Sequence, residues 1–100
     1  METMRLLTWN INSLRLRLPL LQQLVEEQNP DVICLQETKV PDPLFPADAV
    51  RALGYPHVHF AGMKGYNGVA VLSRVPCAPL AGLPSWCARA DCRHIAVRLD

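Results

Sequence analysis

The sequence lacks any long apolar run. No stretch approaches the roughly 18 consecutive apolar residues that a membrane-spanning helix requires. The first residues also lack the apolar core of a secretory signal, because the acidic Glu2 is followed shortly by Arg5. These two absences predict a protein without a membrane span, located in the cytoplasm.

An excess of charge of one sign is also missing. Ten Lys and Arg residues are balanced by nine Asp and Glu residues, and the formal net charge is +1. Domains that hold nucleic acid through charge alone are usually much more basic. Net charge therefore identifies no partner, and any nucleic-acid site must depend on particular residues.

The four cysteines include no C-x-x-C pair. Cys34 lies within an apolar stretch and is predicted to be a small buried side chain. Cys77, Cys87 and Cys92, with His94, could form a zinc site, but their spacing matches no standard zinc module. A disulfide among these later cysteines is the other alternative, which a reducing compartment disfavours.

The chain has the size of one small domain. Half of its 100 residues are apolar, which is enough for a hydrophobic core. There is no internal repeat and no low-complexity segment. The sequence therefore predicts a single globular unit rather than an array or a linker.

The first forty residues have the pattern of a β-α-β unit. Apolar stretches at 5–9 and 31–36 predict two strands. Between them, Pro19 marks the first turn of a helix, and Asn29-Pro30 ends it. The buried stripe of this helix is predicted to consist of Leu20, Leu21, Leu24 and Val25.

The remaining elements are predicted from turn residues and alternation. The proline-rich segment 40–46 indicates a loop, and Gly54 should cap a short helix over 47–53. Alternating residues predict an antiparallel hairpin. Its strands are 57–60 and 69–73, and the glycine-rich segment 62–68 is its turn. The segment 76–93 predicts little regular structure, and 95–99 predicts a last strand.

Polar side chains follow both strands of the β-α-β unit. Glu37 comes directly after the second strand, and Asn10 and Asn12 come at the end of the first. Parallel strands place these ends at one edge of the sheet, where open α/β sheets bind ligands. A carboxylate beside amide oxygens suits a hard cation such as Mg2+. From spacing alone, a solvated glutamate and ordinary turn asparagines remain the alternatives.

Several short motifs occur in an order and spacing that resemble those of one enzyme family. They are Trp9-Asn10-Ile11-Asn12-Ser13-Leu14-Arg15, Leu35-Gln36-Glu37-Thr38-Lys39, Phe45-Pro46, Leu53-Gly54-Tyr55 and Gly65-Tyr66-Asn67-Gly68-Val69-Ala70. Together they resemble the exonuclease III family of abasic-site DNA endonucleases, within the endonuclease/exonuclease/phosphatase superfamily. The resemblance covers nearly the whole chain.

The resemblance implies a fold and an activity. The fold would be of the α/β (α+β) class, with residues 1–100 as the N-terminal part of a four-layer α/β sandwich that contains a mixed sheet, truncated at the C-terminus. The complete enzyme would use Mg2+, with Mn2+ as an alternative, to cut DNA on the 5′ side of abasic sites and to trim 3′ ends in the 3′–5′ direction. Its partner would be double-stranded DNA with abasic sites or 3′ ends, with no obligate protein partner.

The resemblance also assigns roles to residues near the sheet edge. Glu37 would be the metal-binding glutamate, and Asn10 the asparagine that arranges ligands and the reacting group beside the metal. Asn12 falls where relatives carry an aspartate or an asparagine. Lys39 would neutralise phosphate or orient Glu37 through a charged hydrogen bond, although a plain surface lysine is equally compatible with the sequence.

Three further residues resemble DNA-contacting positions of the family. Arg15 matches a position that contacts phosphate, and Lys64 and Tyr66 lie on a loop like one that touches the duplex. Contacts of this kind position nucleic acid and carry no base information. His57 and His59 share one face of a predicted strand, but no acid is placed beside them, so they are not predicted to be catalytic.

The main departure from the family is the absence of its later groups. These are an aspartate that activates water, an aspartate-x-asparagine pair, a tyrosine and a terminal aspartate–histidine pair. The isolated chain is therefore expected to be inactive and prone to association, because a split sandwich exposes apolar faces. Two other hypotheses remain: a phosphodiesterase of the same superfamily that acts on a phosphoinositide or sphingolipid, and a non-catalytic truncated polypeptide.

Overall fold

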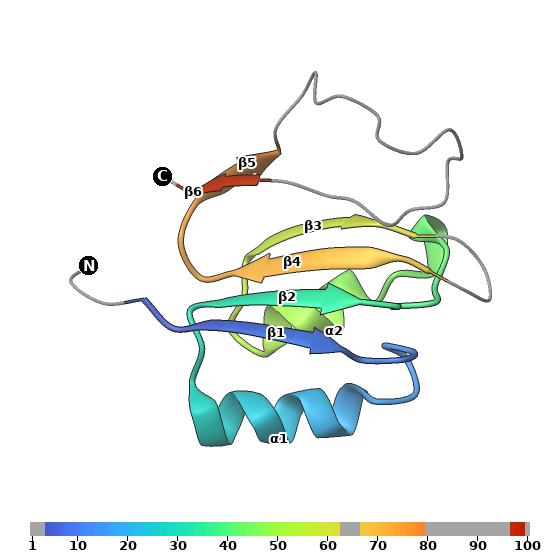
Figure 1. The fold of residues 1–100 in the computed structure, drawn as a ribbon, viewed down its shortest axis with the longest axis horizontal. Helices are drawn as coiled ribbons and strands as arrows, with labels where there is room; N and C mark the ends of the chain where they lie inside the picture. The colour runs from blue at the N-terminus through green and yellow to red at the C-terminus, as the bar shows by residue number, and fades with distance from the viewer. Residues whose placement is uncertain (1–3, 63–66, 80–96, 100) are drawn as a thin grey trace.

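The computed structural model describes residues 4–62, 67–79 and 97–99. Its centre is a four-stranded mixed sheet with the strand order β1-β2-β4-β3 (Figure 1). The strands are β1 (Leu6–Asn10), β2 (Val32–Gln36), β3 (His57–Ala61) and β4 (Val69–Ser73). β1 and β2 are parallel, whereas β4 is antiparallel to both β2 and β3. The predicted mixed sheet, parallel pair and antiparallel hairpin are therefore confirmed.

Two helices connect these strands. α1 (Leu18–Gln28) has Pro19 in its first turn and ends at Asn29, whose backbone is left-handed and whose N–H donates to the Val25 carbonyl. α2 (Ala47–Ala52) is followed by Leu53 and then by Gly54, which has a φ of +106°. That φ is accessible to glycine without steric cost, so the predicted glycine cap is confirmed. A single 3-10 turn, η1 (Asp42–Leu44), interrupts the predicted loop at 40–46.

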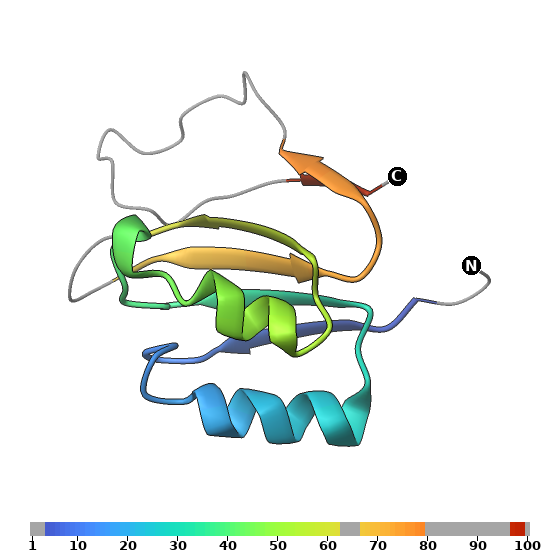
Figure 2. The ribbon, with the colours of Figure 1, turned by 180° about the vertical axis from the view of Figure 1, so that it is seen from behind.

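The hydrophobic core lies on the helical face of the sheet. In Figure 2, α2 lies in front of the sheet and α1 runs beside its β1 edge. Because alternate strand residues point to opposite faces, one set from all four strands packs against the helices. This set comprises Leu7, Trp9, Ile33, Leu35, Val58, Phe60, Ala70 and Leu72. α1 contributes Leu21 and Val25 to the same core.

The predicted buried stripe of α1 is only half right. Leu21 and Val25 are buried, but Leu20 is 51% exposed and Leu24 is only partly buried. α1 flanks the β1 edge of the sheet, so in the described part of the chain a narrow row of its side chains is covered. The helical period was therefore correct, while the width of the buried face was overestimated.

The prediction of little regular structure over 76–93 is wrong at its start. β5 (Cys77–Pro79) pairs antiparallel with β6 (Val97–Leu99) in a separate two-stranded sheet. This pairing joins segments about twenty residues apart, so long-range hydrogen bonding overrides the local proline-rich composition. The residues between these two strands lie outside the described part of the chain.

The sheet face opposite the helices carries a mixture of polar and apolar residues. The register places Thr8, Cys34, Val71 and His59 in one row across it. Cys34 is only partly buried, which corrects the prediction of a small buried side chain. Its burial is still sufficient to raise the pKa of the thiol. Leu6, at the edge of the same face, is 65% exposed.

No helix in the described residues combines the length and apolar character that crossing a membrane requires.

Candidate active site

The C-terminal ends of β1 and β2 lie side by side, as the β-α-β pattern predicts. Asn10 and Gln36 are register partners, and the Ile11 N–H donates to the Gln36 carbonyl at 3.0 Å. Beyond the strands, the Ser13 N–H donates to the Glu37 carbonyl at 2.9 Å, and the Leu14 N–H to the Thr38 carbonyl at 3.0 Å. The chain after β1 is thus bound along the chain after β2, which holds the two polar motifs together.

A third segment meets them from β4. The Thr38 N–H donates to the Gly68 carbonyl at 3.1 Å, and the Lys39 N–H donates to the Asn67 carbonyl at 2.8 Å. Residues 67–68 come just before β4, the strand that pairs with β2 on the side away from β1. Glu37 therefore lies between two neighbouring segments that both hydrogen-bond to its own loop.

The backbone of this region is unusual. Within the described ranges, every residue with positive φ other than Asn29 and Gly54 lies in these three segments, namely Asn12, Ser13, Glu37, Lys39, Asn67 and Gly68. A left-handed backbone at a residue other than glycine costs of order 1–3 kcal/mol and persists where surrounding contacts fix it. Such residues concentrate at functional sites. The backbone alone therefore marks this edge of the sheet as the candidate site.

Four polar side chains form a connected group here. The Asn10 Nδ2 donates a hydrogen bond to the Glu37 Oε2. The Lys39 Nζ lies 3.9 Å from the Glu37 Oε1 and donates a hydrogen bond to the Asn12 Oδ1. Asn10 and Lys39 thus approach the two oxygens of one carboxylate from different sides. The structure brings together the four residues that the sequence singled out.

The Glu37–Lys39 pair is partly open to solvent. The exposed fractions of the two side chains are 43% and 30%. An ion pair this exposed contributes little to stability. Its effect is on orientation, because Lys39 and Asn10 together fix the direction in which the carboxylate points. A carboxylate that is held in place and still open to solvent is available to a cation or to a phosphate-bound cation.

The donor set suits Mg2+ better than a softer metal. Mg2+ is commonly held by one or two carboxylates, with phosphate oxygens and water completing its octahedron. Glu37 supplies one carboxylate, and the amide of Asn10, which bonds to that carboxylate, carries a neutral oxygen, whereas the Asn12 Oδ1 already accepts a hydrogen bond from Lys39. In the described part of the chain, no three His, Cys, Asp or Glu side chains are grouped so as to hold a metal ion. Glu37 alone therefore offers a single carboxylate ligand, and a Mg2+ ion bound here would need further oxygen atoms.

The structure describes only some of the other residues that the sequence singled out. Arg15 is exposed, shortly after the segment that follows β1. Lys64 and Tyr66 lie outside the described residues, as do Cys87, Cys92 and His94 of the alternative zinc site. Gln36 points to the face opposite the core, as its alternation predicts, and its Nε2 donates to the Thr8 Oγ1 at 3.0 Å.

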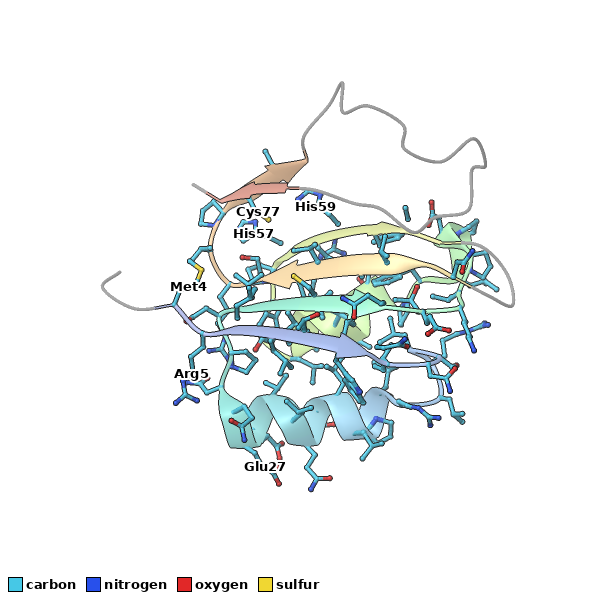
Figure 3. All side chains as sticks on the ribbon, viewed as in Figure 1. Met4, Arg5, Glu27, His57, His59 and Cys77 are labelled. Atoms are coloured by element: carbon cyan, nitrogen blue, oxygen red, sulfur yellow. The ribbon has the colours of Figure 1, made fainter. Side chains whose placement is uncertain are left out.

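The two histidines lie away from this site. His57 is in register with Ser73, which pairs with Val32 at the opposite end of β2. With about 3.3 Å per strand residue, that row is roughly 16 Å from Glu37. Both histidines are labelled in Figure 3, and the His59 Nε2 is 3.3 Å from the carbonyl oxygen of Cys77 in β5. These histidines therefore lie apart from the group around Glu37.

Two residues of the site were missed by sequence reasoning. Thr38 is buried between Glu37 and Lys39, and Gly68 packs directly against it. The only sequence signal was that each belongs to a motif, since neither residue type carries obvious chemistry. Their role follows from the packing.

Comparison with known proteins identifies the family of this chain. The model of the Endonuclease/Exonuclease/phosphatase family matches residues 7–87. The chain belongs to this family. Among its relatives is exodeoxyribonuclease III of Haemophilus influenzae, which is 46% identical over 71 residues, covering 71% of this chain and 26% of that protein.

Solved structures of this family share the fold. The 3′ phosphatase NExo from Neisseria, bound to a product DNA hairpin, is 40% identical with a TM-score of 0.84, over 97% of this chain and 38% of that chain. An AP endonuclease from Archaeoglobus fulgidus is 38% identical with a TM-score of 0.85, over 97% of this chain and 37% of that chain. The chain thus spans well under half the length of the relatives it matches. The resemblance to exonuclease III enzymes and the α/β class are confirmed.

Proposed function

We propose that residues 1–100 form the N-terminal portion of a single Endonuclease/Exonuclease/phosphatase domain in a DNA-repair nuclease. The activity proposed is hydrolysis of phosphodiester bonds on the 5′ side of abasic sites, together with 3′–5′ exonuclease activity. The observation that carries the proposal is Glu37, held by Asn10 and Lys39 at the sheet edge. The relatives named exodeoxyribonuclease III and AP endonuclease favour DNA as the substrate.

The residues of the site have separate tasks in this proposal. Mg2+, or Mn2+ in its place, would supply charge stabilisation at the scissile phosphate. Glu37 would be its carboxylate ligand, and Asn10 would keep that carboxylate oriented through its amide N–H. Lys39 carries a positive charge that attracts phosphate, and Asn12 accepts a hydrogen bond from its ammonium group and so restrains it.

Binding of the DNA backbone would extend beyond this group. Arg15 is exposed and free to meet a phosphate in the approach to the site. We propose Lys64 and Tyr66 as further DNA contacts, on the strength of the family motif alone. Double-stranded DNA would be the partner, without an obligate protein partner. The partly buried Cys34 thiol is compatible with the reducing cytoplasm, where we propose that the protein acts.

A substrate competition tests the proposed function. The full-length protein that carries these residues is incubated with Mg2+ and a labelled duplex containing one abasic site, with phosphoinositide or sphingomyelin vesicles as competitors. We expect incision 5′ to the abasic site, loss of incision in EDTA, and no effect of the lipids. Hydrolysis of the lipid headgroup with no incision of the duplex would instead assign the lipid-cleaving branch of the family. Mg2+-independent incision would contradict the role of Glu37.

Asn10→Ala should weaken the site without removing a charge. Its amide N–H donates to the Glu37 Oε2, and loss of such a partner behind a metal ligand typically costs 10–100-fold in metal affinity or activity. We therefore expect the Mg2+ concentration for half-maximal incision to rise by about this factor. The measurement is a Mg2+ titration of the incision rate. Gln22→Ala on α1, whose amide donates to Glu26 on the same helix, is the control and should leave the titration unchanged.

A further inference from the structure

Among the residues that the structure describes, the hydroxyl of Thr38 has no hydrogen-bond partner. Thr38 is 1% exposed, and its Oγ1 is buried without a donor or acceptor in reach among the described residues. Buried polar groups are paired in the great majority of cases, and an unpaired one costs about 1–3 kcal/mol. Thr38 stands between Glu37 and Lys39, so this cost arises within the candidate site. The residues packed around the hydroxyl explain why it is left unpaired.

Gly68 occupies the space beside that hydroxyl. A Cβ atom on Gly68 would lie 2.2 Å from the Thr38 Oγ1 and 3.2 Å from the Lys39 nitrogen. The φ of Gly68 is +97°, which also favours glycine. Two independent features therefore require glycine at this position: its backbone conformation and the contact with Thr38.

The close approach makes two backbone hydrogen bonds possible. The carbonyls of Asn67 and Gly68 accept the N–H groups of Lys39 and Thr38, which are the two residues that follow Glu37. Glu37 and Lys39 both have a φ of +54°. The two hydrogen bonds hold the backbone of residues 37–39 in this conformation, and the backbone conformation sets the direction of both side chains. A Cβ on Gly68 would force residues 67–68 away from Thr38. Both hydrogen bonds would lengthen, and the Glu37 carboxylate would shift.

We propose that Gly68 and Thr38 are positioning residues for the metal ligand Glu37. This inference rests on the proposed function for the identity of the metal, and extends it to residues that touch neither metal nor DNA. Because Gly68 has no Cβ, its backbone can pack directly against the Thr38 hydroxyl. This contact sets the distance between residues 67–68 and residues 37–39. That distance in turn orients the carboxylate. Functional groups must be held within about 0.5 Å of their productive geometry, and a steric displacement at Gly68 exceeds that tolerance.

The test compares two glycines with similar backbones. Gly54 has a φ of +106°, but a Cβ there would meet nothing within 4 Å. Gly68→Ala and Gly54→Ala therefore share the backbone strain, and Gly68→Ala alone adds the clash. Mn2+ binding to the full-length protein without DNA is measured by electron paramagnetic resonance, with the melting temperature recorded for each variant. We expect Mn2+ binding about 10–100-fold weaker in Gly68→Ala, and unchanged in Gly54→Ala.

A double variant isolates the contact itself. Thr38→Ala removes the hydroxyl that the new Cβ would strike, so Gly68→Ala combined with Thr38→Ala should recover most of the lost Mn2+ affinity. Non-additivity of this kind is expected for residues in direct contact. Recovery of folding in the double variant, should Gly68→Ala alone not fold, supports the proposal in the same way. Additive losses, or failure of both variants to fold, would overturn it, because backbone strain would then account for the whole effect.

The outcome also separates this inference from the proposed function. If the wild-type protein binds Mn2+ and the double variant recovers affinity, but the wild type cuts no DNA, the positioning role of Gly68 and Thr38 stands and the nuclease function is wrong. If the wild-type protein cuts DNA but Gly54→Ala and Gly68→Ala bind Mn2+ equally well, the nuclease function stands and the positioning role of Gly68 and Thr38 is wrong. A wild-type protein that binds no Mn2+ would overturn both.

Discussion

Replacing Glu37 is expected to lower the rate of Mg2+-dependent DNA incision by at least about 100-fold, with the fold retained. Charge stabilisation by a bound metal contributes several kcal/mol to the transition state, and each 1.36 kcal/mol is a factor of ten in rate. Glu37→Gln keeps the size of the side chain and its contact with Asn10, but removes the charge that we propose binds the cation. Glu37→Ala removes both the charge and the contact, so its loss should be at least as large. The measurement is single-turnover incision of an abasic duplex by the full-length protein across a range of Mg2+ concentrations.

Glu27→Gln is the matched control. Glu27 is an exposed glutamate on α1, labelled in Figure 3, and its side chain accepts a hydrogen bond from Gln23, four residues before it. The same substitution there removes the same charge from the surface and should leave the rate unchanged. Near wild-type activity of Glu37→Gln at limiting Mg2+ would contradict the assignment of Glu37 as a metal ligand. Equal losses in both variants would indicate a general effect of charge.

The order of the elements could be predicted from the sequence because local signals agree with the tertiary structure. Pro19 and Asn29 bound α1, Gly54 follows α2, and alternation marks β3 and β4. Each of these signals acts within a few residues of the chain. The prediction failed where pairing with a distant segment determines the structure. β5 is the example, because its pairing with β6 leaves no local sequence signal.

The composition of the site was predictable only in part. Glu37 and Asn10 could be paired in advance because parallel strands bring their C-terminal ends together. The left-handed backbone at Glu37 and Lys39 could not, because neither residue type signals it. It arises from hydrogen bonds to residues 67–68, which reach the site only after β4 has paired with β2. Thr38 and Gly68 become meaningful only with that third segment in place.

Removal of the Tyr55 side chain is expected to cause a large loss of stability at the other end of the sheet. Tyr55 is fully buried, and its hydroxyl donates to the Pro30 carbonyl at 2.6 Å. The Arg74 guanidinium lies 4.9 Å from the ring centroid and donates to the Asn29 Oδ1 at 2.6 Å. One side chain thus ties together the segment after α2, the connection from α1 to β2, and the end of β4. Tyr55→Ala should lower the free energy of unfolding by about 3–5 kcal/mol, measured by urea denaturation of the full-length protein.

Tyr55→Phe separates the hydroxyl from the ring. It keeps the packing and the contact with Arg74, but leaves the Pro30 carbonyl unpaired, so the expected loss is about 1–3 kcal/mol. Burial raises the pKa of the Tyr55 hydroxyl, and the positive charge of Arg74 opposes the rise only in part. A raised pKa means that the neutral form is favoured in the folded state. The stability this contributes is therefore present below the ordinary tyrosine pKa of about 10, and is lost as the pH rises through the higher folded value. Tyr55→Phe should lack this alkaline component. A Tyr55→Ala variant no less stable than Tyr55→Phe would show that the ring does not join these segments.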